Sequence, residues 1–108
     1  MTEILLPFPP SVNDMYIRGR TLSPDYRAWK MDAGLKLNRQ HIGAMKSRCV
    51  IHIDLDDTRN GDCDNRAKPI LDLLVSQGVL EGDSKKYVKR VSIGWEKLTG
   101  VRVALETA

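Results

Sequence analysis

The sequence predicts a single α+β domain in which strands and helices follow one another in the order β-α-β-α-β-β. Its 108 residues are close to the commonest size of one domain. No internal repeat, low-complexity tract or linker divides the chain, so we assign residues 1–108 to one mixed α/β domain. Four stretches with apolar residues at every second position are interleaved with two stretches of helical periodicity, and this mixture is typical of an α+β fold.

The four predicted strands each place their apolar residues on one face. They span residues 3–8, 49–56, 87–97 and 101–106. Their inward residues are Ile4, Leu6 and Phe8; Cys49, Ile51, Ile53 and Leu55; Val91, Ile93 and Trp95; and Val101, Val103 and Leu105. On the second strand, His52, Asp54 and Asp56 share the opposite face. We interpret that face as solvated rather than metal-binding, since polar residues commonly line the open side of a half-buried strand.

A first helix is predicted from Pro24 to about residue 42 or 43. Ser23 is a good N-cap, Pro24 suits the first helical position and Asp25 suits the first turn. One apolar stripe consists of Tyr26, Trp29, Ala33 and Leu37, and a second, roughly opposite, of Met31, Leu35 and Ile42. A helix with apolar residues on two sides suggests that both sides are covered, one of them by a second subunit.

A second helix is predicted over residues 66–77. Ile70, Leu71 and Leu74 face the core in this interpretation, and Gly78 ends the helix. The turn-forming residues 57–61, DTRNG, connect the second strand to this helix.

The charge distribution is informative but not decisive. The net charge is +3 and the pI is about 9.0; residues 1–48 hold eight Lys/Arg against four Asp/Glu, and residues 49–108 hold nine against ten. A basic surface beside an acidic cluster suits a protein that holds both phosphates and a metal, but an ordinary solvated surface explains these charges as well.

No apolar run approaches the ~18 residues that cross a bilayer, and the N-terminus does not resemble a signal peptide. Cys49 and Cys63 are expected to be free thiols of a cytosolic protein.

The stretch GDCDNRAKPILD, residues 61–72, concentrates three aspartates and a lysine in twelve residues. In an extended chain, the side chains of Asp62 and Asp64 point the same way, ~6–7 Å apart, and can share one hard cation. If the following turn is helical, Asp64, Lys68 and Asp72 lie along one face. A structural explanation stays open, in which Asp64 caps the helix and Lys68 pairs with Asp72 at the surface. It leaves Asp62 unexplained, as it does Asp83, which precedes a predicted strand.

Other kinds of site fit the sequence less well. A calcium loop that begins at Asp56 has Thr58 at its third position and Ala67 where a bidentate glutamate is required, so we exclude it. His41 and His52 have no serine or cysteine in a recognisable nucleophile context, and no glycine-rich phosphate loop is present. Cys63, between the two aspartates, is expected to pack rather than react.

The sequence resembles the RusA family of Holliday junction resolvases over nearly the whole chain. LPFPPSVNDMY is similar to the N-terminal motif of the family, and GRTLSPDYRAWK to its basic loop and first helix. DCDNRAKPILDLL closely resembles the central D-x-D-N-x-x-K-x-x-x-D segment. GVLEGDSKKYVKRVSIGW resembles the segment that supplies a further aspartate before a strand. Family members often have two acids at that last site, where this chain has Gly82-Asp83.

The resemblance implies a magnesium-dependent endonuclease that cuts four-way DNA junctions. The Mg²⁺ ligands implied are Asp62, Asp64 and Asp83, and these three with Lys68 are the implied catalytic residues. We expect Asn65 to orient a ligand or cap the helix, and Asp72 to hold Lys68. DNA contacts are expected from Arg18, Arg20, Arg27, Lys30, Lys85 and Lys86.

The partners expected from this resemblance are branched DNA and a second copy of the chain, without a membrane. A junction offers two symmetry-related strands to cut, so a two-fold homodimer with one site per subunit is expected. Members of the family occur in bacteria, prophages and phages, which implies a cytoplasmic location. The alternative hypothesis is a non-catalytic module that binds junctions or duplex DNA and uses its carboxylates structurally; a nuclease of flaps or other branches is a narrower alternative.

Overall fold

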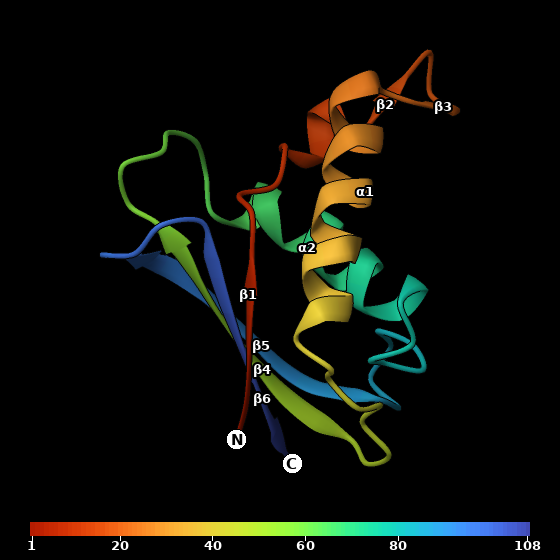
Figure 1. Cartoon of the computed structure of the whole chain (residues 1–108), viewed down its shortest axis with the longest axis vertical. Coiled ribbons are helices and arrows are strands. Elements are labelled where there is room, and N and C mark those ends of the chain that lie inside the picture. Colours follow the sequence, from red (N-terminus) through yellow and green to blue (C-terminus); the bar gives the residue numbers. More distant parts are fainter.

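The computed structural model describes residues 1–108 and confirms the α+β class (Figure 1). The elements are β1 (Thr2–Leu6), the short 3-10 helix η1 (Val12–Asp14), β2 (Tyr16–Ile17), β3 (Thr21–Leu22), α1 (Pro24–Arg39), β4 (Cys49–Asp56), α2 (Asp64–Ser76), β5 (Val88–Glu96) and β6 (Val101–Thr107). The predicted order of the main elements is therefore confirmed. The sequence did not predict η1 or the small β2–β3 hairpin, because both lie in a segment without apolar periodicity.

The main sheet has the strand order β1-β6-β4-β5. Both pairings of β6 are antiparallel, whereas β4 and β5 run parallel. Parallel neighbours need a crossover connection, and α2 provides it. Because α2 runs back along the sheet, the end of β4 and the start of β5 lie at opposite ends of the molecule. This topology decides where the predicted site residues lie.

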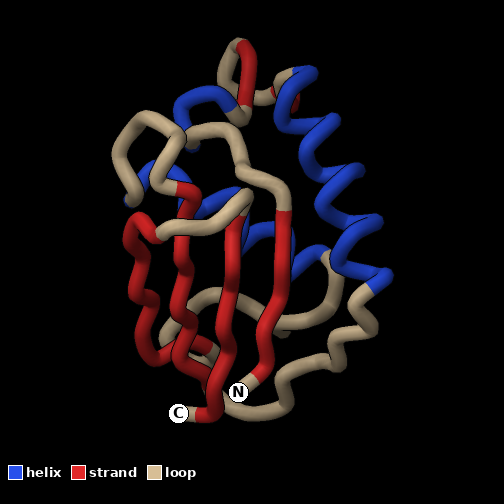
Figure 2. Tube along the Cα trace, turned by 60° about the vertical axis from the view of Figure 1, so that its left-hand side comes forward, coloured by secondary structure: helices blue, strands red, loops and turns tan.

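Both helices cover the same face of the main sheet, and the other face is open (Figures 1 and 2). The covered face buries the alternating residues that the sequence predicts: Ile51, Ile53 and Leu55 of β4 are at most 1% exposed. Strand β6 buries Val101, Val103 and Leu105 in the same way. The prediction for β5 is only partly correct, because Val91 is 37% exposed on this edge strand and the β4–β5 register shifts at its start.

Helix α1 begins as predicted but ends earlier. The Ser23 hydroxyl accepts a hydrogen bond from the Tyr26 N–H at 3.1 Å, which confirms the N-cap. The helix stops at Arg39 because the Gln40 side chain pairs with both the N–H and the carbonyl of Leu5, at 2.8 and 2.7 Å, and His41 has a positive φ of 54°. Gln40 thereby occupies part of the free edge of β1.

Helix α2 begins two residues before its predicted start, at Asp64, and ends near the predicted Gly78. Gly78 has a φ of 78°, the left-handed conformation that commonly ends helices at glycine. Pro69 lies inside the helix and is buried. A proline has no N–H, so the Asn65 carbonyl has no i+4 donor. Neither helix combines the length and the hydrophobicity that crossing a bilayer requires.

Candidate metal and nucleic-acid site

The acidic turn, residues 61–64, is not an extended strand but turns into α2 from Cys63 onward, which corrects our expected geometry. Cys63 has helical torsion angles, and the Asn65 N–H donates to the Asp62 carbonyl at 3.2 Å. Side chains two residues apart on a helical turn do not face the same way. Asp62 and Asp64 therefore lie close along the chain, but their carboxylates are not aligned by strand geometry.

Neither carboxylate of this turn is used by the fold. Asp62 and Asp64 are exposed, and neither side chain makes a hydrogen bond or an ion pair. The expected capping role is wrong, because Asp64 is the first residue of α2 and no side chain caps this helix. Asn65 likewise makes no side-chain hydrogen bond. The positive end of α2 favours negative charge here, which explains why unpaired acids are tolerated.

Lys68 and Asp72 form the predicted pair on α2. Their Nζ and Oδ2 atoms are 3.4 Å apart, one helical turn from each other. Burial, then the charges of Asp72 and Tyr16, raise the pKa of Tyr26 on α1 to about 12. Lys30 lies over the Tyr26 ring at 5.5 Å. The lysine beside the acidic turn is thus paired with Asp72, whose charge also acts on Tyr26 of α1.

Arg66, which was not among the predicted site residues, fixes the acidic turn. Its guanidinium donates to the carbonyl of Pro9 at 2.9 Å and to that of Asn60 at 3.2 Å. It also lies 4.9 Å from the centre of the Phe8 ring. The guanidinium passes so close to Gly61, whose φ is 116°, that a Cβ there would lie 2.9 Å from it. Only a glycine suits that position, so its place just before Asp62 was the available sequence signal.

Asp83 follows the C-terminal end of α2, whereas Asp62 and Asp64 lie at its start. The segment before it stays at the C-terminus of α2, because the N–H groups of Val79 and Leu80 donate to the Leu74 carbonyl. The segment after it reaches the start of β4, where the Cys49 N–H donates to the Tyr87 carbonyl at 3.0 Å. The helix has 13 residues, which is about 20 Å at 1.5 Å per residue. Within one chain the three expected ligands do not meet, and no group of three or more His, Cys, Asp or Glu side chains is placed to hold a metal.

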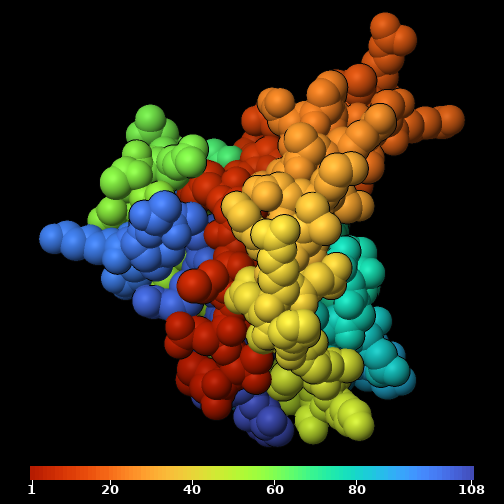
Figure 3. Space-filling view, viewed as in Figure 1, coloured from red at the N-terminus to blue at the C-terminus, as the bar shows by residue number.

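The first group of predicted DNA contacts lies at the same end of the molecule as the acidic turn. Arg18 and Arg20 form the exposed tip of the β2–β3 hairpin, which projects in the space-filling view (Figure 3). Arg27 and Lys30 follow on the first turns of α1. None of these four cations forms an ion pair within the chain. They are therefore free to contact phosphates.

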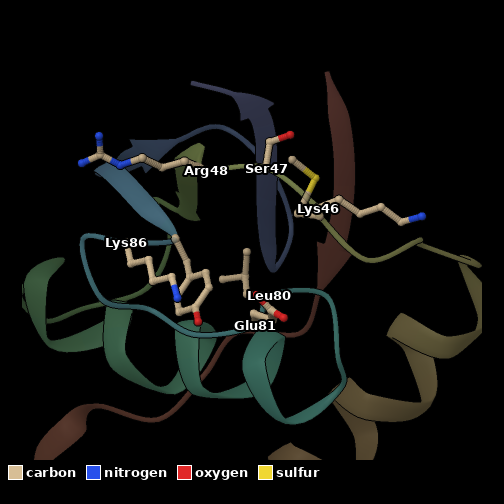
Figure 4. A pocket seen from close by; sticks show the side chains of 8 residues that line it. Lys46, Ser47, Arg48, Leu80, Glu81 and Lys86 are labelled. Carbon is tan, nitrogen blue, oxygen red and sulfur yellow. The ribbon is translucent and has the colours of Figure 1, made fainter.

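The second group, Lys85 and Lys86, lies at the far end, beside Asp83. There a pocket of about 210 Å³ separates residues 45–48 from residues 80–87 (Figure 4). Lys46 and Arg48, which were not among the predicted DNA contacts, belong to this cationic end as well. Figure 4 shows their side chains pointing to opposite sides, so they form a strip rather than a converging pocket. None of these cations has an ion-pair partner.

The polar face of β4 is paired rather than solvated. The Asp54 carboxylate accepts two hydrogen bonds from Arg102, at 2.8 and 3.0 Å, and His52 lies 3.1 Å from Glu106. Our expectation is wrong for Asp56, which is only 5% exposed. Its carboxylate accepts from the N–H and hydroxyl of Thr58 and from the Gly100 N–H, and the bonds to Thr58 chiefly lower its pKa.

Two comparisons with known proteins, a scan against family models and a search of curated proteins, found no match. The RusA resemblance therefore stays a prediction from the quoted motifs. The chemistry of the acidic turn fits Mg²⁺, which binds through one or two carboxylates and keeps waters and substrate phosphates as its other ligands. Asp62 and Asp64 provide two such carboxylates from one chain.

Proposed function

We propose that the chain is a Mg²⁺-dependent, structure-selective endodeoxyribonuclease that resolves four-way (Holliday) DNA junctions by paired symmetrical nicks, in DNA recombination and repair. The observation that carries this proposal is the start of α2, where Asp62 and Asp64 have no partner and Lys68 is exposed nearby. Carboxylates that bind Mg²⁺ beside an ammonium suit the hydrolysis of a phosphodiester. The RusA resemblance supplies the substrate and the cytoplasmic, bacterial or phage setting.

In this proposal each residue has a defined task. Asp62 and Asp64 bind the cation, which supplies an activated water and an electrophile when bound. Lys68 neutralises the charge that develops on the phosphate or orients the attacking water. Asp72 keeps the Lys68 ammonium near its own helical turn, 3.4 Å away. The N-terminus of α2 adds a field that favours an anionic phosphate.

The proposed enzyme is a homodimer in which one site combines residues of two chains. Asp83 lies a full helix length from Asp62 and Asp64, so a third carboxylate reaches them only from a second copy. A two-fold axis that opposes the two ends of α2 also brings Lys85 and Lys86 towards the acidic turn of the other copy. Met31 and Leu35, 69% and 53% exposed on α1, offer apolar surface for such an interface.

The second candidate is the non-catalytic DNA-binding module. The observation that favours it is that one chain gathers no set of three metal-binding side chains. Unpaired cations at both ends of the molecule suit DNA binding with or without cleavage. The two candidates differ in whether bound DNA is cut.

The test compares labelled four-way junction, linear duplex and flap DNA, each with and without Mg²⁺. We expect symmetrical nicks in the junction alone, and only with Mg²⁺. Binding without metal should weaken steeply as salt rises, through counterion release, and the mass in solution should be twice 12.2 kDa. Salt-sensitive binding without any nick would replace the nuclease by the binding module, and the absence of binding would reject both.

A further inference from the structure

A pocket of about 450 Å³ lies beside the acidic turn and has no role in the site described above. Five segments line it: the chain after β1, η1, the first turns of α1, the loop after β4 and the start of α2. Its lining residues are Phe8, Pro9, Pro10, Asp14, Asp25, Trp29, Arg59, Asn60 and Arg66. Asn60 and Arg66 bracket the acidic turn in sequence and are hydrogen-bonded to each other at 3.2 Å. A ligand in this pocket therefore lies next to the proposed cleavage centre.

The charge of the pocket disfavours both a phosphate and a cationic amine. Two carboxylates, Asp14 and Asp25, are balanced by two guanidinium groups, Arg59 and Arg66. A phosphate would meet the carboxylates, and a cationic amine would meet the guanidinium groups. The balance favours a neutral ligand that offers both donors and acceptors. The strip of Lys46, Arg48, Lys85 and Lys86 has the opposite character and suits phosphates.

Several polar groups around the pocket have no partner within the fold. The Asp25 carboxylate, the Asn60 amide and the Arg59 guanidinium make no side-chain hydrogen bond or ion pair, although Arg59 lies over the Phe8 ring at 5.1 Å. One Asp14 oxygen accepts from the Ser11 hydroxyl at 3.1 Å. The indole N–H of Trp29 is already used by the Pro7 carbonyl at 2.9 Å. The free groups include an acceptor, a donor and an amide that is both.

We propose that this pocket receives a nucleobase next to the scissile phosphate, and that Asp25 and Arg59 decide which base is accepted. This inference rests on the proposed function, because DNA must place the base there. A base is flat and neutral, and its edge carries both donors and acceptors. Carboxylates accept from the cytosine amino group, and arginine donates to guanine acceptors. The Arg59 guanidinium, supported by Phe8, also offers a surface on which a base stacks. Extruding a base from the stack costs least where the base is mispaired or already unpaired.

The first experiment measures base capture without cleavage. Junctions carry a fluorescent purine or pyrimidine analogue, 2-aminopurine or pyrrolocytosine, at each position that flanks the branch point, and the protein is added without Mg²⁺. We expect the emission to change at one position and the change to be lost in Asp25→Asn and Arg59→Gln. The controls are Asp32→Asn, whose carboxylate pairs with Lys36 at 3.2 Å on the same helix, and Arg39→Gln, which removes the same charge elsewhere on α1.

The second experiment measures cleavage of four junctions that differ only in the base at that position. The wild type should prefer one base by on the order of tenfold or more, and Asp25→Asn should change the order of preference, because it replaces an acceptor with a donor. Equal cleavage of all four junctions would reject the base pocket, and so would emission changes that persist in Asp25→Asn and Arg59→Gln. Neither result would contradict the nuclease proposal. If no junction is cut, the nuclease proposal fails, and the emission measurement still decides on the pocket.

Discussion

Two pairs of aspartates lie within the eleven residues 54–64 and have opposite environments. Asp54 and Asp56, at the end of β4, have their carboxylates occupied by Arg102 and by Thr58 and Gly100. Asp62 and Asp64, on the turn that follows, have no partner. The first pair holds the end of the sheet together. The second pair is available to a ligand from outside.

At the acidic turn, the hydrogen bonds within the chain hold the backbone and leave the carboxylates unpaired. Arg66 ties the turn to Pro9 and Asn60, both through backbone carbonyls. A turn whose backbone is fixed and whose carboxylates are unpaired suits a cation-binding site, because the backbone is already ordered and the acids break no other bond when they bind a cation. This contrast favours the metal site over a purely structural role for the acids.

The largest effect is expected when one charge is removed from the acidic turn. We expect Asp62→Asn or Asp64→Asn to slow junction nicking roughly a thousandfold or more, since a bound metal supplies several kcal/mol to the transition state. Binding to the junction without metal should stay the same or tighten, because a negative charge near phosphates is lost. The measurement pairs nicking rates with gel retardation of the same junction.

Asp57→Asn is the matched control for this experiment. Asp57 is exposed in the same loop, and no side-chain hydrogen bond or ion pair involves it. It should nick at nearly the wild-type rate. Full activity of the Asp62 and Asp64 variants would remove them from the site, whereas joint loss of binding and nicking would assign them to the fold.

Subunit mixing tests whether Asp83 completes the site of the other copy. Asp64→Asn and Asp83→Asn are each expected to be inactive alone. In a mixed dimer, one site then carries both changes and the other carries neither. After exchange, half of the dimers are mixed and each has one intact site of two, so about a quarter of the wild-type sites should recover.

The readout of the mixing experiment is single-strand nicking of a labelled junction. As a control, Asp62→Asn mixed with Asp64→Asn should not recover, because both changes fall in the same half of the site. Recovery in the control alone, or in neither mixture, would contradict a site shared between chains.

Local features were predictable from the sequence, because their causes lie within a few residues. The Ser23 cap bonds to Tyr26, the alternation of β4 reflects one covered face, and the Lys68–Asp72 pair needs only helical spacing. Helix ends were less accurate. The end of α1 depends on Gln40, which reaches Leu5, 35 residues away.

Features set by distant partners were not predictable. The Asp56 carboxylate accepts a hydrogen bond from Gly100, 44 residues away. The Arg66 guanidinium donates one to Pro9, 57 residues away. The position of Asp83 follows from the parallel pairing of β4 with β5, which leaves no local signature in the chain. Spacing identified candidate acids, but only the topology shows that one of them lies at the far end of α2.

Removing the Arg66 side chain should loosen the acidic turn without touching its charges. Arg66→Ala loses two hydrogen bonds from a charged donor and the contact with Phe8, which we expect to cost about 2 kcal/mol of stability. The nicking rate should fall further than the affinity for the junction, because the turn that carries the two carboxylates loses its fixed position. Chemical denaturation and Mg²⁺ titration of the nicking rate check this, and Arg90→Ala, an exposed arginine on β5 without an ion pair, is the control. Unchanged stability and Mg²⁺ dependence would mean that Arg66 does not position the turn.

The smallest effect is expected at Asp56, one of the two paired aspartates at the end of β4. Asp56→Asn should lower the melting temperature by several degrees at pH 7 but leave the nicking chemistry intact, since Asp56 holds Thr58 and Gly100 rather than a ligand. The pKa of Asp56 in the folded chain lies below its ordinary value of 3.8, chiefly through its hydrogen bonds with Thr58. A carboxyl with a lowered pKa stabilises the fold fully above the unfolded pKa, and this contribution disappears as the pH falls through the folded value. The difference in melting temperature between the wild type and Asp56→Asn should therefore be constant from pH 7 to about 5 and shrink below pH 4. Asp57→Asn, measured in parallel, should show no such difference at any pH. A gap that persists at pH 2 would mean that the shape of the Asp56 side chain, and not its charge, holds the end of the sheet.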